Sequence, residues 1–127
     1  MTISEKAIEI HRSGCNCAQS VVGAYADEKG WDKDMVLKLT SGLGLGFGGS
    51  GEICGAVVGA CMVLSESIAD LPKGERYAII KKFVKEFEDK CGAVKCPDLK
   101  KPKTEDQKRY SCDELVAQAA GMLKEYL

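Results

Sequence analysis

Cysteine is the residue type that could carry most of the chemistry in this chain. The 127 residues include seven cysteines but a single histidine, His11. Thiols serve in proteins as disulfides, metal ligands, redox groups or small core residues. The odd number leaves one thiol unpaired, and residues 1–12 have the pattern of an amphipathic helix rather than of an export signal. We therefore expect a reducing cytoplasm, where so many thiols indicate metal binding or redox chemistry more often than structural disulfides.

Four of the cysteines share a position beside a predicted helix start. Three of them each follow a residue that is typical of a helix N-cap. The caps are Asn16, Ser50 and Ser111, and the cysteines are Cys17, Cys54 and Cys112. The fourth, Cys96, precedes Pro97, a residue suited to a first helical turn. Helix N-termini carry partial positive charge and free N–H groups, so these positions favour thiolates.

Thiolates that converge on one point repel each other unless a cation lies between them. Zinc and an iron-sulfur cluster are the two natural occupants of such a site. The spacing does not decide between them, because the chain has neither the repeated C-x₂-C of zinc knuckles nor the C-x₂-C-x₂-C of bacterial ferredoxins. The fold must therefore gather four cysteines that lie far apart in the sequence.

The remaining candidates have simpler interpretations. Cys61 and Cys91 continue apolar helix faces and are expected to be buried hydrophobes, whereas Cys15 lies outside the predicted helices. His11 is expected to pack at the end of the first helix rather than to form a Cys-His nucleophile pair. The glycine-rich stretch 42–59 contains G-x-G-x-x-G but lacks a preceding strand, so we interpret it as a loop whose amides point at sulfur or at an anion.

Apolar periodicity predicts an all-α fold. We expect one domain over residues 1–127, a bundle of five to six helices around a central helix rich in glycine and alanine. The predicted helices are 3–11, 17–28, 32–40, 51–69 (the central helix), 74–90 and 112–126, with a polar loop at 92–109. The small-residue face of helix 51–69 is compatible with a homodimer and equally with packing inside one chain.

Charge and hydropathy exclude two classes of partner. The net charge is −1, and the basic excess between residues 71 and 110 lacks interleaved aromatic residues, so we expect no nucleic acid. The longest apolar run, 53–64, has twelve residues, whereas a spanning helix needs about twenty. We therefore expect no membrane insertion.

Three parts of the sequence resemble one known family. They are Asn16-Cys17-Ala18-Gln19-Ser20-Val21, then Glu52-Ile53-Cys54-Gly55-Ala56-Val57-Val58-Gly59 after a glycine-rich lead, and then Cys96 and Cys112. On these residues the chain resembles the C_GCAxxG_C_C family, which is named for a presumed redox activity. The resemblance implies a small helical domain whose four family cysteines match Cys17, Cys54, Cys96 and Cys112. Related domains in split-Soret cytochromes are fused to c-type haem modules, and there an iron-sulfur centre is implied.

The leading hypothesis is a cytoplasmic redox protein that passes electrons to a redox partner protein. Cys17, Cys54, Cys96 and Cys112 would ligate an iron-sulfur cluster of undefined type, and amides of the loop 42–51 would tune its potential. The cofactor-binding residues then include Gly49, Gly51 and Gly55. Two alternatives stay open: a metal-free thiol–disulfide oxidoreductase or redox sensor, and an interaction protein with a structural zinc site. No catalytic residue is assigned.

Overall fold

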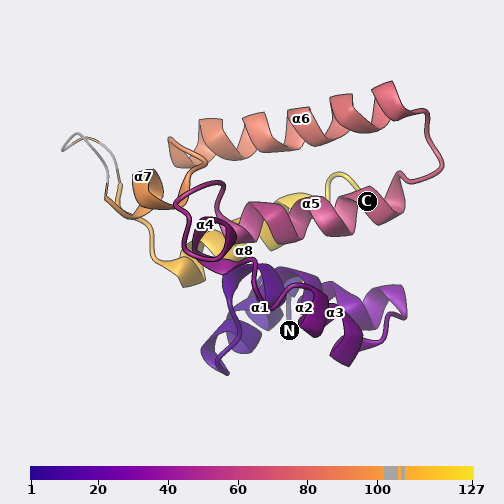
Figure 1. Ribbon diagram of the computed structural model, residues 1–127, viewed down its shortest axis with the longest axis horizontal. Coiled ribbons are helices and arrows are strands. Elements are labelled where there is room, and N and C mark those ends of the chain that lie inside the picture. Colours follow the sequence, from indigo (N-terminus) through magenta and orange to yellow (C-terminus); the bar gives the residue numbers. More distant parts are fainter. Residues whose placement is uncertain (102–105, 107) are drawn as a thin grey trace.

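The computed structural model describes residues 1–101, 106 and 108–127, and these residues form an all-α fold. The helical segments are α1 (Ile3–Arg12), α2 (Cys17–Lys29), α3 (Lys33–Leu39), α4 (Gly44–Phe47), α5 (Gly55–Ser67), α6 (Lys73–Cys91), α7 (Cys96–Lys100) and α8 (Cys112–Leu123) (Figure 1). The predicted fold class is confirmed, and the number of segments is slightly above the predicted five to six. The short α4 contains left-handed residues, Leu45 and Gly46, so it is a tight turn rather than a regular helix.

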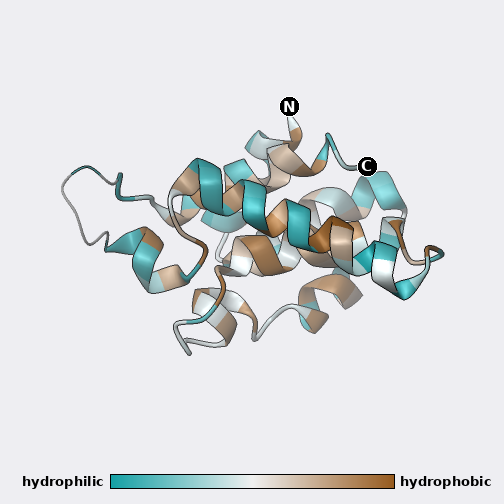
Figure 2. Ribbon diagram, turned by 90° about the horizontal axis from the view of Figure 1, so that it is seen from above, coloured by the Kyte–Doolittle hydropathy of each residue, from teal (hydrophilic) through white to brown (hydrophobic). Residues whose placement is uncertain are grey.

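The core lies where α2, α5 and α8 pack together. Helix α1 covers α2 and α8, α3 packs on α2, and α6 lies along α5 (Figure 1). Helix α6 is amphipathic: Phe83 and Phe87 are fully buried, while the lysines on its other side are exposed. Figure 2 shows this alternation of hydrophilic and hydrophobic turns along α6. Among the described residues no helix combines the length and the apolar character that a bilayer-spanning segment requires.

Small residues allow α2 and α5 to approach closely. A Cβ atom added to Gly59 would lie 2.7 Å from the carbonyl oxygen of Ala18 and 3.1 Å from its Cα. Only glycine leaves room for the neighbouring backbone at that position. The small-residue face predicted for the central helix is thus covered by α2 within the same chain. The small-residue face of α5 therefore gives no support to a homodimer, which stays a prediction.

Helix α5 begins at Gly55, so the predicted start at residue 51 is wrong. The segment before it is extended because it pairs with the chain ahead of α7: Ile53 and Lys95 form an isolated antiparallel bridge. The Cys54 amide donates to the Val94 carbonyl at 2.8 Å, and the Cys96 amide donates to the Glu52 carbonyl at 2.9 Å. Cys54 itself occupies the N-cap position, and the predicted cap Ser50 instead donates its hydroxyl to the Phe47 carbonyl.

The predicted polar loop 92–109 is also partly wrong, because it contains α7. Pro97 lies in the first turn of this short helix, where its missing amide costs nothing, and the fully buried Leu99 anchors the helix to the core. The Tyr110 amide donates to the Leu99 carbonyl at 3.1 Å, which leads the chain into α8. Residues 102–105 and 107 of the predicted loop lie outside the described residues.

Asn16 ties the start of α2 to the end of α3. Its side-chain oxygen accepts from the Gln19 amide at 2.8 Å, and its Nδ2 donates to the Thr40 and Ser41 carbonyls at 3.1 and 3.0 Å. Asn16→Ala is expected to lower the free energy of unfolding by about 1–2 kcal/mol, because the helix cap and the hydrogen bonds to the end of α3 are both lost. Asn16→Ser restores the cap alone and should recover part of the loss. Urea denaturation followed by circular dichroism measures both, and equal stability of Asn16→Ala and the parent protein would contradict this role.

Candidate redox centre

Four cysteines lie at helix N-termini that meet at one end of the molecule. Cys17, Cys96 and Cys112 are the first residues of α2, α7 and α8, and Cys54 is the N-cap of α5. The first turns of α5, α7 and α8 lie toward the same end of the bundle (Figure 1). The predicted helix starts at Cys17 and Cys112 are confirmed, each with a complete capping box, formed by Asn16 with Gln19 and by Ser111 with Glu114.

Three contacts bring these helix starts together. The α2–α5 approach places the backbone of Gly55 against Cys17, where an added Cβ would lie 3.3 Å from the Cys17 Cβ. The bridge between Ile53 and Lys95 holds the segments that carry Cys54 and Cys96 side by side. Helix α8 packs on both α2 and α5 and brings Cys112 to the same place. Tertiary packing therefore brings helix starts from four separate parts of the sequence into one region. Among the described residues, the group whose ligand atoms lie within 4.8 Å of one another contains Cys17 and Cys112, together with His11, and does not contain Cys54 or Cys96.

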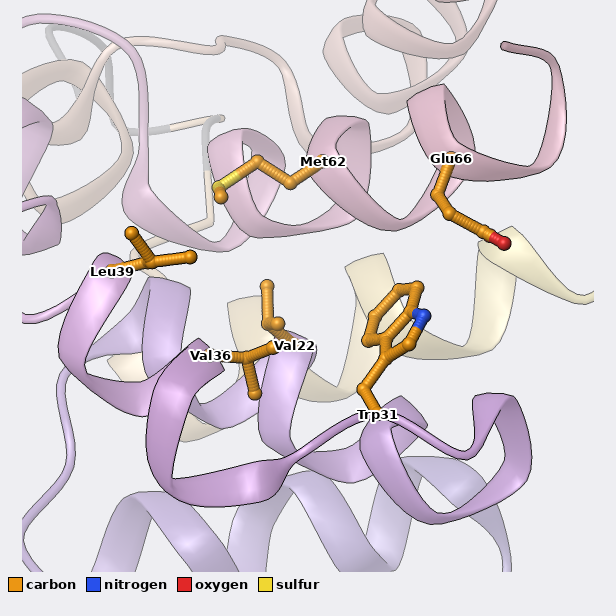
Figure 3. Close-up of a pocket in the computed structure, with 6 residues that line it drawn as sticks. All are labelled: Val22, Trp31, Val36, Leu39, Met62 and Glu66. Carbon is orange, nitrogen blue, oxygen red and sulfur yellow. The ribbon is translucent and has the colours of Figure 1, made fainter. Parts of the chain in front are cut away.

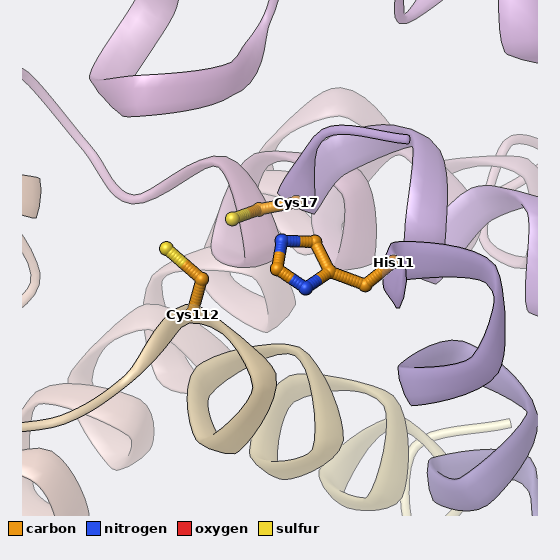
Figure 4. Close-up of side chains that lie close together, drawn as sticks. All are labelled: His11, Cys17 and Cys112. Carbon is orange, nitrogen blue, oxygen red and sulfur yellow. The ribbon is translucent and has the colours of Figure 1, made fainter. Parts of the chain in front are cut away.

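The sulfur atoms of Cys17 and Cys112 lie within 4.8 Å of each other. Their side chains lie near each other (Figure 4), and a hydrogen bond joins them. This bond lowers the pKa of Cys112, and a second hydrogen bond, from the Lys100 ammonium, acts in the same direction. The pKa of Cys17 is raised by the bond to Cys112 and by burial. The interaction between the two side chains thus favours negative charge on Cys112 over Cys17.

Cys54 is the most deeply placed member, with 2% of its surface exposed. Burial raises the pKa of its thiol to about 11, and the negative charges of Cys96 and Cys112 add to the rise. The backbone amides of Ala56 and Val57 donate to its sulfur and oppose this shift. The free amides of the first turn of α5 thus stabilise negative charge on Cys54, as expected at a helix N-terminus.

The glycine residues predicted at the site have different surroundings. Gly55 packs against Cys17, and Gly51 packs against Pro97, 3.3 Å from an added Cβ, whereas Gly49 has open space around it. The amides of Gly48, Ser50 and Glu52 donate to carbonyls inside the loop itself. The amide donors on Cys54 come from α5, and amide bonds from the loop to a bound group stay a prediction.

His11 belongs to the site, although the sequence did not indicate it. Its side chain reaches past the end of α1, and its ring lies with the sulfurs of Cys17 and Cys112 (Figure 4). One ligand atom from each of the three residues lies within 4.8 Å of the others.

Two polar residues beside this group were also not indicated by the sequence. Asp113 accepts a hydrogen bond at 2.6 Å from His11 Nδ1, and Lys100 donates to Cys112. The packing of α1 on α8 creates this group, and no local pattern reports that packing.

The other three cysteines have different surroundings. Cys91 is buried in the core, and Cys61 is half-buried on α5, where burial raises its pKa to about 11. Cys15 is half-buried in the turn before α2. All seven cysteines are free thiols. The predicted core role of Cys91 agrees with its position, and Cys61 packs on the edge of the core.

An apolar pocket lies elsewhere, between α2, α3 and α5. Its lining comprises Val22, Trp31, Val36, Leu39, Met62 and Glu66 (Figure 3). This lining contains no thiol, and Glu66 is its one titratable side chain. The thiol chemistry of the molecule therefore belongs to the cysteine cluster and not to this pocket.

The sequence of the chain matches one known protein family. Residues 15–126 match the model of the family described as "Putative redox-active protein (C_GCAxxG_C_C)". The chain belongs to this family. The C_GCAxxG_C_C match includes all seven cysteines, while His11 lies before its first residue. No curated protein and no solved structure matches the chain.

The thiols are expected to differ in reactivity when the protein is reduced and free of metal. At neutral pH Cys112 should be alkylated by iodoacetamide well before Cys61, because the pKa of Cys112 is lowered and that of Cys61 is raised to about 11. The Cys61 reaction should accelerate only as the pH rises toward its pKa. Lys100→Met removes one hydrogen-bond donor and should slow alkylation of Cys112. Peptide mass mapping over a pH series measures the order, and an earlier reaction at Cys61 would contradict it.

Proposed function

We propose that Cys17, Cys54, Cys96 and Cys112 ligate an iron-sulfur cluster and that the protein transfers electrons through it. The observation that supports this most is that four cysteines, each at a helix N-terminus, come together at one end of the bundle. Their thiols are close enough for the charge on Cys54 to be influenced by Cys96 and Cys112, and that on Cys17 by Cys54 and Cys112. Membership in the family described as "Putative redox-active protein (C_GCAxxG_C_C)" agrees with the proposal.

The donor set fits such a cofactor. Cysteine thiolates are the usual ligands of iron-sulfur clusters, and four of them satisfy a two-iron or a four-iron cluster. Four thiolates in one place carry a repulsion that the Lys100 ammonium and the amides of Ala56 and Val57 offset in part. A bound metal centre supplies the remaining positive charge, and its chemistry is one-electron transfer.

The residues of the chain divide the site into a buried and an accessible side. Cys17 and Cys54 are buried, so they hold their part of the centre away from water. Cys96 and Cys112 are half-exposed, and the exposed side chains of Lys95 and Lys101 flank the short helix that begins at Cys96. A redox partner with an acidic surface would therefore approach from α7 and the start of α8. The odd number of cysteines favours a reducing compartment, and we propose the cytoplasm.

A second function, thiol–disulfide exchange without metal, is favoured by the hydrogen-bonded pair Cys17 and Cys112. The Cys112 thiolate would attack a disulfide of a substrate, breaking its S–S bond and releasing one substrate thiolate. Cys17, after losing its proton to that thiolate, would attack the mixed disulfide. The products are the Cys17–Cys112 disulfide and a substrate with both sulfurs reduced, so two electrons pass from the protein to the substrate.

Anaerobic purification followed by metal and sulfide analysis and an absorption spectrum tests these functions. Iron and acid-labile sulfide with visible charge-transfer bands are expected. Zinc in place of iron would replace the proposal with a structural metal site. A colourless protein without metal, whose thiols reduce a model disulfide, would replace it with the exchange enzyme.

A further inference from the structure

One ring nitrogen of His11, Nε2, faces the sulfur atoms of Cys17 and Cys112 (Figure 4). Nδ1 of His11 lies 2.6 Å from Oδ1 of Asp113. The opposite edge of the ring, with Nε2, is directed toward Cys17 and Cys112 (Figure 4). The ligand atoms of the three residues lie within 4.8 Å of one another. Donors that share one metal atom at about 2.0–2.3 Å lie at most about 4.6 Å apart, so this spacing is close to that of a common metal atom.

Asp113 holds the imidazole ring in the orientation that a ligand needs. The Asp113 carboxylate accepts at Oδ1 from His11 and at Oδ2 from Arg12 Nε, at 2.9 Å. Because a carboxylate accepts, Nδ1 carries the proton in the neutral ring, and Nε2 presents its lone pair to the sulfurs. Histidines that ligate metals almost always donate their second nitrogen to such a partner. The hydrogen bond from His11 also lowers the pKa of Asp113, which keeps this partner charged.

We propose that His11 is a nitrogen ligand of the same centre, a fifth protein donor in addition to the four cysteines on the iron that Cys17 and Cys112 would bind, and that Asp113 is its positioning residue. This inference rests on the proposed metal centre. It concerns this chain in particular, because His11 precedes the first residue of the family match. The helix α1 that carries His11 is held on α8 partly by the Ser4 hydroxyl, which donates to the Ala117 carbonyl at 2.9 Å. The ligand thus comes from an element outside the matched family segment.

A nitrogen ligand changes the electronic properties of the centre in a known direction. Replacement of cysteine by histidine on iron raises the reduction potential, because a neutral imidazole donates less negative charge than a thiolate. His11→Cys is therefore expected to shift the midpoint potential to a more negative value. Glu9→Asp, at an exposed position of the same helix, keeps the charge and should leave the potential unchanged.

The single histidine of the chain makes a direct test possible. The whole protein is produced with histidine that carries the heavy nitrogen isotope, purified anaerobically and reduced, and its electron–nuclear hyperfine spectrum is recorded. We expect a strong nitrogen coupling that changes with the isotope, together with the negative shift of potential in His11→Cys. A cluster signal without an isotope-sensitive coupling, or an unchanged potential in His11→Cys, overturns the role of His11 and leaves the proposed function intact.

A protein without iron overturns the proposed function and still permits a decision on His11. The labelled chain is then loaded with an NMR-active cadmium isotope alone. A scalar coupling between cadmium and the histidine nitrogen supports ligation by His11. Stoichiometric cadmium binding without that coupling, or the absence of cadmium binding, overturns it.

Discussion

Cys54→Ser is expected to lower the iron content of the anaerobically purified protein by at least about tenfold. Outer-shell partners of metal sites already cost about 10–100-fold in affinity when removed, and Cys54 is proposed as a direct ligand. Serine fits the space of the 2% exposed thiol, so the helix α5 should still form. Iron and sulfide analysis, with circular dichroism to confirm the helical content, measures the effect.

Cys61→Ser is the matched control for this substitution. Cys61 lies on the same helix, seven residues after Cys54, and faces the α5–α6 groove that includes Val58, Ile80 and Val84. This variant should retain its iron and its absorption bands. Equal loss of iron in the two variants would indicate general unfolding, and full iron content in Cys54→Ser would remove Cys54 from the ligand set.

Gly59→Ala is expected to destabilise the protein by about 2 kcal/mol, although alanine is the better helix former. The added methyl group would meet the Ala18 carbonyl at 2.7 Å, and backbone atoms cannot turn aside as a flexible side chain can. Helices α2 and α5 must move apart, which also separates Cys17 from Cys54. We therefore expect lower iron content together with lower stability, measured by chemical denaturation and iron analysis.

Gly74→Ala is the matched control for this contact. Gly74 also lies in a helix, and an added Cβ there has no atom within 4 Å. The same chemical change should stabilise the protein by about 0.5–1 kcal/mol, because alanine reduces the freedom of the unfolded chain. A loss of stability in Gly59→Ala with a gain of stability in Gly74→Ala would support the close approach of α2 and α5. A gain of stability in Gly59→Ala would contradict it.

Local sequence patterns predicted the helices well where caps and apolar faces agree. The capping boxes of Asn16 and Ser111 correctly marked the starts of α2 and α8. The start of α5 was predicted four residues too early. Ile53 pairs with Lys95, more than forty positions away, and such a long-range pairing leaves no periodic signal in the sequence. The short α7 was missed for a similar reason, because its anchor Leu99 is an isolated apolar residue in a polar segment.

The positions of cysteines beside helix starts were predictable from the sequence, but their polar neighbours were not. A cysteine beside a helix start can be recognised from the residues around it, and that reasoning selected Cys17, Cys54 and Cys112. His11, Lys100 and Asp113 join them only because α1, α7 and α8 meet at the same end of the molecule. Asp113 follows Cys112 directly, so the residue that orients His11 comes from the same helix start as one of the sulfurs.

Native mass spectrometry of the anaerobically purified protein tests most directly whether the cysteine cluster holds an iron-sulfur cluster. We expect a mass above that of the polypeptide by whole numbers of iron and sulfide, and this excess should be lost in Cys54→Ser and retained in Cys61→Ser. A mass equal to that of the reduced polypeptide, or lower by a pair of hydrogens for each disulfide, would contradict it.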